Sequence, residues 1–446
     1  MAVSSTDLEK KDIKSLLIKQ SIPSSIGILF MSVNILIDTI FVGQWIGSLA
    51  IAALSVVMPV TFFISSLGMA IGVGGSSVLS RALGKGDKDK AVSTFAHQLM
   101  MTLLISSLFV VAGLLFDDEI LYAFGAAGKI TAPAKEFFLP IVIAVPFQAL
   151  SMMGNNVIRA EDKSKHAMIA MIISTIANLV LDVLFIKVLN MGIMGAAIAT
   201  GSSFVLSFLY ILWFFIYRSE LKLKLQHFVW NKKLSWEIIS MSFVTFARQG
   251  VISLLNVILN HTLFAQGGEA AITIYGIVSR MLMFALFPVL GVTQGFLPIA
   301  GYNYGAGNTG RVKESIRLSI LYAGGLAIFI FIIIMVLAKP IVSVFTTDPE
   351  VIKATPGALR WVFAASPIIA VQLVGAAYFQ AAGKPVKALL LTLSKQGFFL
   401  IPLVLILPQF FGIFGVWVAF PIADVLSTIV TGIFLKKEMN TQLKDE

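Results

Sequence analysis

The sequence ALGKGD at residues 82–87 returns as NYGAGN at residues 303–308, which lies 221 positions further along the chain. Both copies keep their two glycines at the same places. The same offset aligns IRAEDKSKHA at residues 158–167 with FQAAGKPVKA at residues 379–388. One fixed register over most of a chain indicates an internal duplication, so the fold is expected to consist of two similar halves.

Long apolar runs separate these repeated turns. Hydrophobic residues make up 58% of the 446 residues and charged residues 13%, and the mean hydropathy is +0.92. Soluble domains carry roughly 25% charged residues, so this composition indicates an integral membrane protein. The runs predict twelve membrane-spanning helices, at roughly 16–43, 50–80, 91–116, 133–160, 164–189, 192–217, 237–265, 270–302, 312–338, 355–382, 385–409 and 413–435.

Each half therefore holds six predicted spans. Because six is even, both halves enter the membrane in the same direction, as in transporters built from parallel repeats. The expected fold is an all-α membrane protein with two six-helix lobes related by a pseudo-two-fold axis along the membrane normal. We expect residues 1–217 to form the N-terminal lobe, residues 218–236 a cytoplasmic linker, and residues 237–446 the C-terminal lobe.

The net charge of +10 follows the predicted topology. Of the 33 Lys and Arg residues, 24 lie on one side of the predicted membrane, six on the other and three within spans. By the positive-inside rule, both termini of this multi-pass protein are cytoplasmic, and the basic charge does not indicate nucleic-acid binding. The chain has no cysteine and only four scattered histidines, so the sequence indicates no metal site.

Three of the 23 acidic residues lie well inside predicted spans, namely Asp38, Asp182 and Asp424. A carboxylate at mid-membrane costs at least roughly 2.5–3.5 kcal/mol, which makes a functional role the default interpretation. Asn34 precedes Asp38 by one helical turn, and Asn178 precedes Asp182 in the same way, so each amide shares a helix face with its acid.

We expect Asp38 and Asp182 to face each other in the N-terminal lobe and to form an ion-coupling site with Asn178 and Thr200. Like-charge repulsion and desolvation would both favour a shared proton. The same oxygens could instead bind Na⁺, or the two acids could only hydrogen-bond polar neighbours that hold the helices together. The sequence leaves these alternatives open.

The C-terminal half contains charged residues of its own. Either Arg248 or Lys395 pairs with Asp424 in a neutral structural pair, or these residues line a cavity between the lobes. Proline is frequent in the spans, and a proline inside a helix allows it to bend. We expect Pro23, about four turns from Asp38, to be a hinge that couples ion binding to helix bending.

DTIFVG at residues 38–43, SRALGKGD at residues 80–87 and the duplicated segments together resemble the multidrug and toxic compound extrusion (MATE) family. FARQG at residues 246–250, and LSKQG followed by FFLIPLVLILP at residues 393–408, are similar to its MepA-type bacterial branch. The resemblance covers nearly the whole chain. It implies a cation-coupled antiporter that exports bulky, mostly cationic or amphipathic compounds through a V-shaped cleft between the lobes.

The resemblance assigns roles by position. It makes Asp38 and Asp182 the first-lobe aspartates, and Asn178 and Thr200 their oxygen-donating companions. It also implies a set of polar residues around the substrate cavity: Asn34, Asn155, Asn156, Arg248, Gln249, Asn256, Gln372, Lys395 and Asp424. Branches that bind Na⁺ in the second lobe use acids in the seventh and tenth spans, which this chain lacks. We therefore favour coupling to H⁺ in the first lobe, with Na⁺ as the alternative.

Two other functions are alternatives to the antiporter. A lipid-linked oligosaccharide flippase of the same superfamily should have a strongly basic cavity and often fourteen spans. A membrane prenyltransferase needs clustered acids at a membrane face, and the only cluster is DDE at residues 117–119, in an outside loop. We expect a monomeric secondary transporter of the bacterial cytoplasmic membrane, not an enzyme. Its partners would be organic cations, amphipathic drugs and the bilayer, with no nucleic acid and no cofactor besides the coupling ion.

Overall fold

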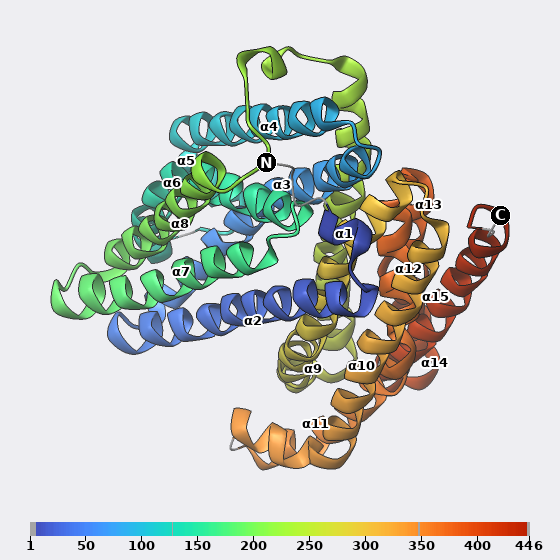
Figure 1. The fold of residues 1–446 in the computed structure, drawn as a ribbon. Helices are drawn as coiled ribbons and strands as arrows, with labels where there is room; N and C mark the ends of the chain where they lie inside the picture. Colours follow the sequence, from blue (N-terminus) through green and yellow to red (C-terminus); the bar gives the residue numbers. More distant parts are fainter. Residues whose placement is uncertain (1–5, 127, 347, 444–446) are drawn as a thin grey trace. The chain divides into compact units, whose positions relative to one another are not determined.

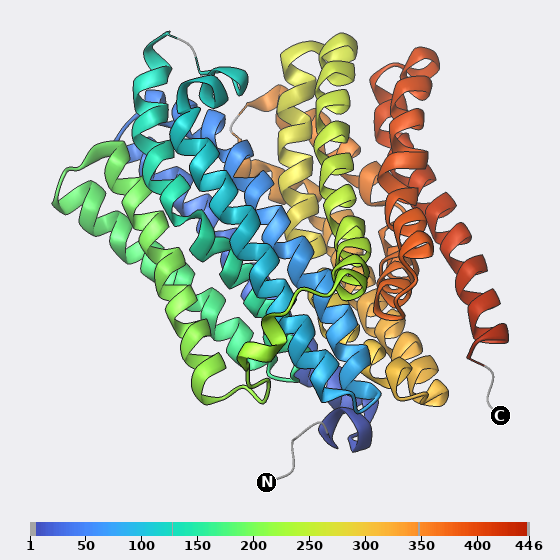
Figure 2. The ribbon, with the colours of Figure 1, turned by 90° about the horizontal axis from the view of Figure 1, so that it is seen from above.

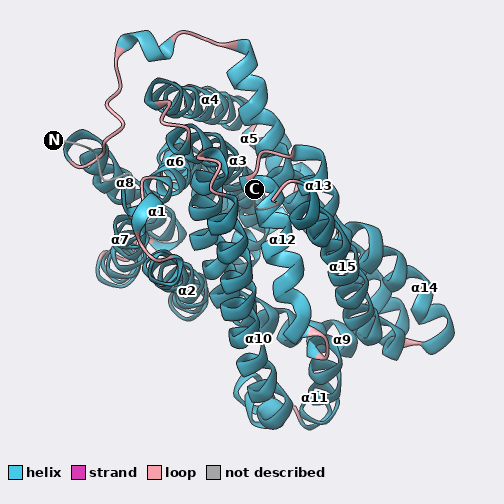
Figure 3. Ribbon diagram, turned by 45° about the vertical axis from the view of Figure 1, so that its right-hand side comes forward, coloured by secondary structure: helices cyan, strands magenta, loops and turns pink. Residues whose placement is uncertain are grey.

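The computed structural model describes residues 6–126, 128–346 and 348–443 of the chain. Every regular element in these ranges is a helix, and the ribbon contains no strand there (Figures 1 and 3). The expected all-α membrane fold is confirmed. The helices are α1 (Thr6–Lys10), α2 (Ile13–Trp45), α3 (Ser48–Gly84), α4 (Lys88–Leu115), α5 (Asp117–Ala123), η1 (Gly128–Ile130), α6 (Thr131–Ala160), α7 (Ser164–Asp182), η2 (Val183–Val188), α8 (Gly192–Tyr217), η3 (Leu225–Phe228), α9 (Lys232–Gly305), α10 (Thr309–Phe345), α11 (Pro349–Phe363), η4 (Ser366–Ile368), α12 (Ile369–Ala381), α13 (Pro385–Leu393), η5 (Ser394–Leu400), α14 (Ile401–Phe411) and α15 (Ile413–Thr441).

Eleven helical segments of the described residues are long and apolar enough to cross a membrane. One of them, α9, runs over 74 residues, which would measure about 110 Å as a straight helix and exceeds any bilayer. Its helix breaks at Gly268, where φ is 61° and ψ is −152°. Figure 2 shows the two pieces lying side by side. Counting them separately gives the twelve predicted spans.

The chain divides into two compact units that exchange helix segments. The first unit contains Ile26–Thr245. The second unit contains Leu8–Ser25 and Phe246–Glu446, of which the structure describes residues up to 443. Helix α2 therefore begins in the second unit and continues into the first, whereas α9 begins in the first unit and continues into the second.

The repeated turns have the same geometry in both units. Gly86 has φ of 75° and Gly307 has φ of 76°, a left-handed conformation that glycine adopts without steric cost. In the first turn the N–H of Asp87 donates to the carbonyl of Ala82 over 2.9 Å, and in the second Asn308 donates to Asn303 over 3.0 Å. This six-residue closure terminates a helix at each copy, which explains the duplicated ALGKGD and NYGAGN.

The start of α9 and the start of α2 each pack against a glycine, and these two glycines occupy equivalent positions in the repeat. A Cβ added to Gly74 would lie 2.4 Å from the backbone nitrogen of Ser242, and one added to Gly295 would lie 2.7 Å from that of Ser21. The offset of 221 relates both members of these contacts. The start of α9 thus packs on α3 in the first unit as the start of α2 packs on α9 in the second. Such close backbone approach leaves no room for a side chain.

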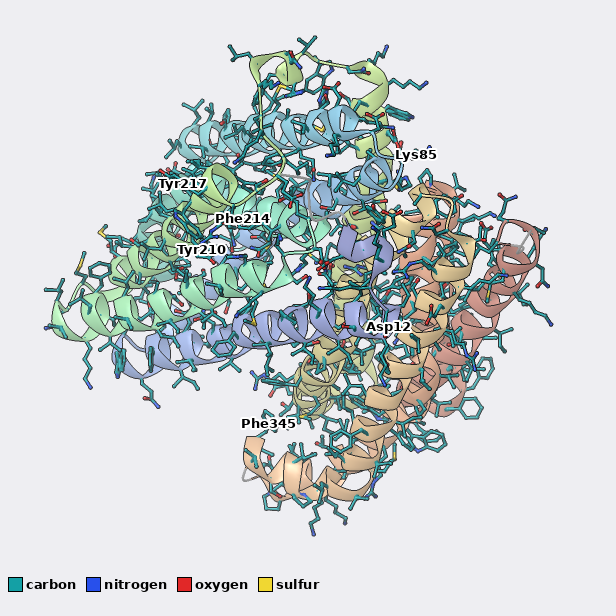
Figure 4. The ribbon with its side chains drawn as sticks, viewed as in Figure 1. Asp12, Lys85, Tyr210, Phe214, Tyr217 and Phe345 are labelled. Atoms are coloured by element: carbon teal, nitrogen blue, oxygen red, sulfur yellow. The ribbon has the colours of Figure 1, made fainter. Side chains whose placement is uncertain are left out.

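Local interactions set the helix ends and hold neighbouring helices together. The carboxylate of Asp12 accepts a hydrogen bond of 3.2 Å from the backbone N–H of Ser15, at the start of α2 (Figure 4). Along α8, Figure 4 labels Tyr210, Phe214 and Tyr217. The hydroxyl of Tyr210 lies 2.8 Å from Nδ1 of His166 on α7, and Phe214 is fully buried. These contacts pack α7 against α8, the two helices that carry most of the predicted ion site.

Candidate functional site

A cavity of about 160 Å³ lies within the first unit, between α2, α3, α6, α7 and α8. It contains the predicted ion-coupling residues Asp38, Asn178 and Thr200, together with Asn34. Its remaining lining is largely apolar or hydroxyl-bearing, and comprises Met31, Ile35, Met58, Thr61, Phe62, Ser65, Phe137, Ile141, Gln148, Met152, Ser174, Thr175, Ser203 and Phe204. The structure thus brings residues from the first, fifth and sixth predicted spans to one site.

Three side chains form a hydrogen-bonded row across this cavity. The amide Nδ2 of Asn34 donates to Oδ1 of Asn178 over 2.9 Å, and Nδ2 of Asn178 donates to Oγ1 of Thr200 over 3.3 Å. The row joins α2 to α7 and α7 to α8. Because each asparagine lies one turn before an aspartate, the same pairing brings the two acids together.

Asp38 and Asp182 are both buried, with exposed fractions of 7% and 0%. Their carboxyl groups lie close enough to influence each other electrostatically. Within the described part of the chain, Oδ1 of Asp38 and both oxygens of Asp182 accept no hydrogen bond from a protein donor. Both predicted acids are thus buried in the first unit, and their role as an ion-coupling pair stays a prediction.

Several buried acceptor oxygens at the site have no hydrogen-bond donor in the described structure. Besides the two acids, Oδ1 of Asn34 and Oε1 of Gln148 are buried and lack a donor among the described residues. None of the described residues that line the cavity is Lys, Arg or His. Buried acceptors without donors are costly, and a proton or a small cation would satisfy them. Carboxylate, amide and hydroxyl oxygens also suit a hard monovalent cation, so the residues fit either ion.

The helix that carries Asp182 changes its winding directly after this residue. Helix α7 ends at Asp182, and η2 continues as a π-helix over Val183–Val188. Widened turns of this kind are rare and are frequent at functional sites. The altered winding thus begins directly after the fully buried Asp182, one turn beyond the cavity-lining Asn178.

Sequence reasoning did not identify the polar residues that α3 and α6 contribute. Thr61 and Ser65 face the cavity one turn apart on α3, and Gln148 reaches it from α6. The hydroxyls of both α3 residues donate to carbonyls of their own helix, at Met58 and Thr61. Their spacing of four residues in an apolar span was the available signal, although buried hydroxyls in membrane helices often serve the backbone alone.

The other predicted cavity residues lie apart from this cavity. Asn155 and Asn156 on α6 do not line it, and their amides donate to the carbonyls of Ser151 and Met152 one turn earlier. In the second unit, Oδ1 of Asn256 accepts a hydrogen bond of 3.3 Å from the hydroxyl of Tyr275. Gln249 is half-buried on α9. These residues stay predictions for substrate contact.

In the second unit, the structure shows which basic side chain forms an ion pair with Asp424. Nζ of Lys395 lies 2.6 Å from Oδ1 of Asp424, and both side chains are buried. Arg248 leaves its Nε buried without a hydrogen-bond partner in the described residues. Gln372 is buried as well, and its amide donates to the carbonyl of Leu391 over 3.1 Å. Of the two cations considered from the sequence, Lys395 is the one that pairs with Asp424.

Comparisons with known proteins agree with this arrangement. A family model described as MatE matches residues 23–184 and 242–406. The chain is similar to the multidrug export protein MepA of Staphylococcus aureus strain N315, with 27% identity over 94% of this chain and 93% of that protein. It is also similar to MepA of Staphylococcus haemolyticus strain JCSC1435, at 25% identity over 94% and 92%.

A solved structure shares the fold over the whole chain. It is described as the outward-facing conformation of a multidrug resistance MATE family transporter of the MOP superfamily. The TM-score is 0.93 at 25% sequence identity, and the match covers 100% of both chains.

Proposed function

The chain belongs to the MatE family of membrane transporters, and from this premise we propose that it exports amphipathic or cationic organic compounds. Export would be driven by protons that enter in exchange across the bacterial cytoplasmic membrane. Drug export is what the names of the two MepA relatives state of those proteins. Their similarity over almost the full chain supports the same substrate class here.

One observation carries the choice of proton coupling at this position. Asp38 and Asp182 are both buried in the first unit, and Asp38 lines a cavity that has no Lys, Arg or His among its described lining residues. Two like charges held together away from water repel each other strongly, and binding one monovalent cation relieves that repulsion. A proton needs no coordination shell, whereas Na⁺ needs several oxygens at once. We therefore favour H⁺ and keep Na⁺ at the same residues as the alternative.

In the proposed cycle, a proton from outside binds the Asp38 and Asp182 pair while substrate leaves. The row from Asn34 through Asn178 to Thr200 would relay the change in charge to α2, α7 and α8. Pro23 would let α2 bend, because it removes one helical hydrogen bond close to Ser25, where α2 passes from the second unit to the first. Release of the proton inside would return the site to its starting state.

The remaining architecture is proposed on the same basis. The lobes would comprise residues 1–217 and 237–446 with the linker at 218–236, and both termini would face the cytoplasm. The protein would act as a monomer. Substrate would contact the polar residues outside the cavity that belong to no buried ion pair, namely Asn155, Asn156, Arg248, Gln249 and Asn256. The bilayer would be the other partner.

The test is transport of ethidium into everted membrane vesicles, where export from the cytoplasmic face is seen as uptake, under a pH gradient or a sodium gradient imposed separately. We expect wild-type efflux to follow the pH gradient, and Asp38→Asn or Asp182→Asn to abolish it. The matched control is Asp118→Asn, because this exposed carboxylate on α5 pairs only with Lys135 in the described residues. The control should retain wild-type efflux.

Each other outcome would change a named part of the proposal. Efflux that follows sodium alone would assign the same residues to Na⁺ coupling. Unchanged efflux in both aspartate variants would refute the ion site in the first unit. Failure of the wild type to move any organic cation would favour a lipid-linked oligosaccharide flippase of the same superfamily.

A further inference from the structure

The second unit holds a buried ion pair that the proposed cycle does not use. Lys395 lies on the π-helix η5 and Asp424 on α15, with 2.6 Å between Nζ and Oδ1. The side chains are 11% and 4% exposed. Burying two charges in a membrane protein costs free energy that their attraction only partly offsets, so a pair kept there requires an explanation.

The internal duplication relates this pair to the cavity of the first unit. The offset of 221 residues places Lys395 on Ser174 and Asp424 on Ser203. Ser174 and Ser203 line the first-unit cavity, and their hydroxyls lie 3.5 Å apart. The two positions thus meet in both units, through hydroxyls in one and through an ammonium and a carboxylate in the other.

The acids of the first unit have no counterparts at their own positions. The offset places Asp38 on Leu259 and Asp182 on Leu403, and Leu259 is fully buried in the apolar core of the second unit. In the second unit the buried carboxylate is Asp424, at a position equivalent to Ser203, and the positive charge beside it is the ammonium group of Lys395.

A buried side chain on the neighbouring helix α12 also has an oxygen without a donor in the described structure. Oε1 of Gln372 is buried without a hydrogen-bond partner among the described residues, and the whole side chain is 3% exposed. Its Nε2 donates to the carbonyl of Leu391, which lies one turn before Lys395. Helix α12, which carries Gln372, packs against both α13 and α15. An amide oxygen and a carboxylate oxygen are ligands that hard cations prefer.

The helix around Lys395 also departs from its counterpart. Residues 394–400 form the π-helix η5, whereas the residues 221 positions earlier lie within the regular helix α7. A π-turn inserts an extra residue and rotates the side chains that follow it. The lysine lies in this widened turn, which separates its surroundings from those of Ser174.

We propose that Asp424 and Gln372 form a second monovalent-cation site and that the ammonium group of Lys395 is its resident cation. A tethered ammonium occupies the site permanently, so the second unit binds no free alkali cation. Removing the ammonium leaves a buried carboxylate that binds Na⁺ instead. One consequence, that only the first unit exchanges coupling ions, rests on the proposed function, whereas the cation site itself does not.

The test measures binding of radioactive Na⁺ to the full-length protein in detergent at about pH 8. Asp38→Asn and Asp182→Asn are present throughout, so the first-unit cavity contributes no carboxylate. In this background we expect no saturable Na⁺ binding. Adding Lys395→Met should create one saturable site per chain, and adding Asp424→Asn to that variant should remove it. Lys395→Arg, which keeps a positive charge, is the matched control and should bind none.

A second measurement covers variants that are difficult to fold. Tryptophan fluorescence gives the melting temperature in sodium chloride and in choline chloride of equal ionic strength, for Lys395→Met and Lys395→Gln. The proposal expects sodium to raise the melting temperature of both variants above any rise in the parent. A Lys395→Met site that survives Asp424→Asn, or no sodium effect in either variant, would overturn the proposal. Unfolding of both Lys395 variants in sodium chloride as well as in choline chloride would also overturn the proposal. If the site binds cations, free Na⁺ should replace the missing ammonium group and stabilise the fold. Because these readouts need no transport, failure of the efflux experiment would leave them unaffected.

Discussion

Replacing Glu161 with Gln should make the protein more stable at high pH than at low pH, relative to wild type. Glu161 follows the end of α6, outside the membrane-spanning segments, and is 9% exposed. Its Oε1 accepts a hydrogen bond of 2.5 Å from the hydroxyl of Ser219, and its Oε2 accepts one of 3.2 Å from the N–H of Glu220. Burial raises the pKa of this carboxyl group to about 7, although these hydrogen bonds oppose the rise.

The sign of the effect follows from the direction of the shift. A folded-state pKa above the unfolded value means that ionised Glu161 is disfavoured in the folded protein. This cost is absent at low pH, where the group is protonated in both states. It develops as pH rises from about 4.5 to about 7 and is complete above that window. A shift of this size corresponds to roughly 3.5 kcal/mol at most, at about 1.4 kcal/mol per pKa unit.

Glutamine removes the ionisation cost and can accept only one of the two hydrogen bonds. Losing one such bond costs about 1 kcal/mol. We therefore expect Glu161→Gln to be stabilised by about 2 kcal/mol at pH 8 and to be near neutral or slightly destabilised at pH 5. The melting temperature of the purified protein should show a gain of a few degrees at pH 8 only.

The control is Glu220→Gln, which removes the same charge from an exposed side chain in the segment between α8 and η3. Its melting temperature should follow wild type across the pH range. The reasoning would be refuted if the melting temperatures of Glu161→Gln and wild type changed in parallel between pH 5 and pH 8. That result would show that ionised Glu161 has no desolvation penalty in the folded protein.

Two further predictions concern the helices that pass between the units. Gly295→Ala places a Cβ 2.7 Å from the backbone nitrogen of Ser21, so overpacking of about 1–3 kcal/mol should lower the melting temperature. The control Gly250→Ala meets no atom within 4 Å and should be neutral or slightly stabilising; equal melting temperatures for the two variants would contradict the close approach. Pro23→Ala restores a helical hydrogen bond in α2, so the melting temperature should rise while ethidium efflux falls severalfold. A variant that is more stable and still transports at the wild-type rate would exclude Pro23 as the hinge.

The repeated turns show how far local sequence reasoning reaches. The echo of ALGKGD in NYGAGN predicted equivalent positions, and Gly86 and Gly307 adopt the same backbone conformation. Apolar runs likewise predicted the spans, since every backbone group in a bilayer must be satisfied within its own helix. Within the described residues, α9 runs across one predicted span boundary, and its backbone breaks there at Gly268, where φ is 61°.

The candidate site was predicted from the free-energy cost of placing carboxylates in a membrane. Carboxylates are expensive in a membrane, so a short list of intramembrane acids pointed to Asp38 and Asp182, and the asparagines one turn earlier indicated the face. Thr61, Ser65 and Gln148 were missed because hydroxyls and amides in a span carry little cost once bonded to their own helix. Which cation pairs with Asp424 was equally open, as both Arg248 and Lys395 satisfy the charge balance.

The sequence by itself determined the membrane class, the twelve spans, the duplication and the two acids. These features depend on properties of single helices: their hydrophobicity, the residues at their ends and the free-energy cost of a buried charge. They can therefore be predicted from the order of residues along the chain. Only the tertiary structure decided that Asn34 bonds Asn178 across 144 residues, that Lys395 rather than Arg248 meets Asp424, and that α2 is divided between two units. Those outcomes depend on which helix faces pack together, and packing is a property of the whole fold.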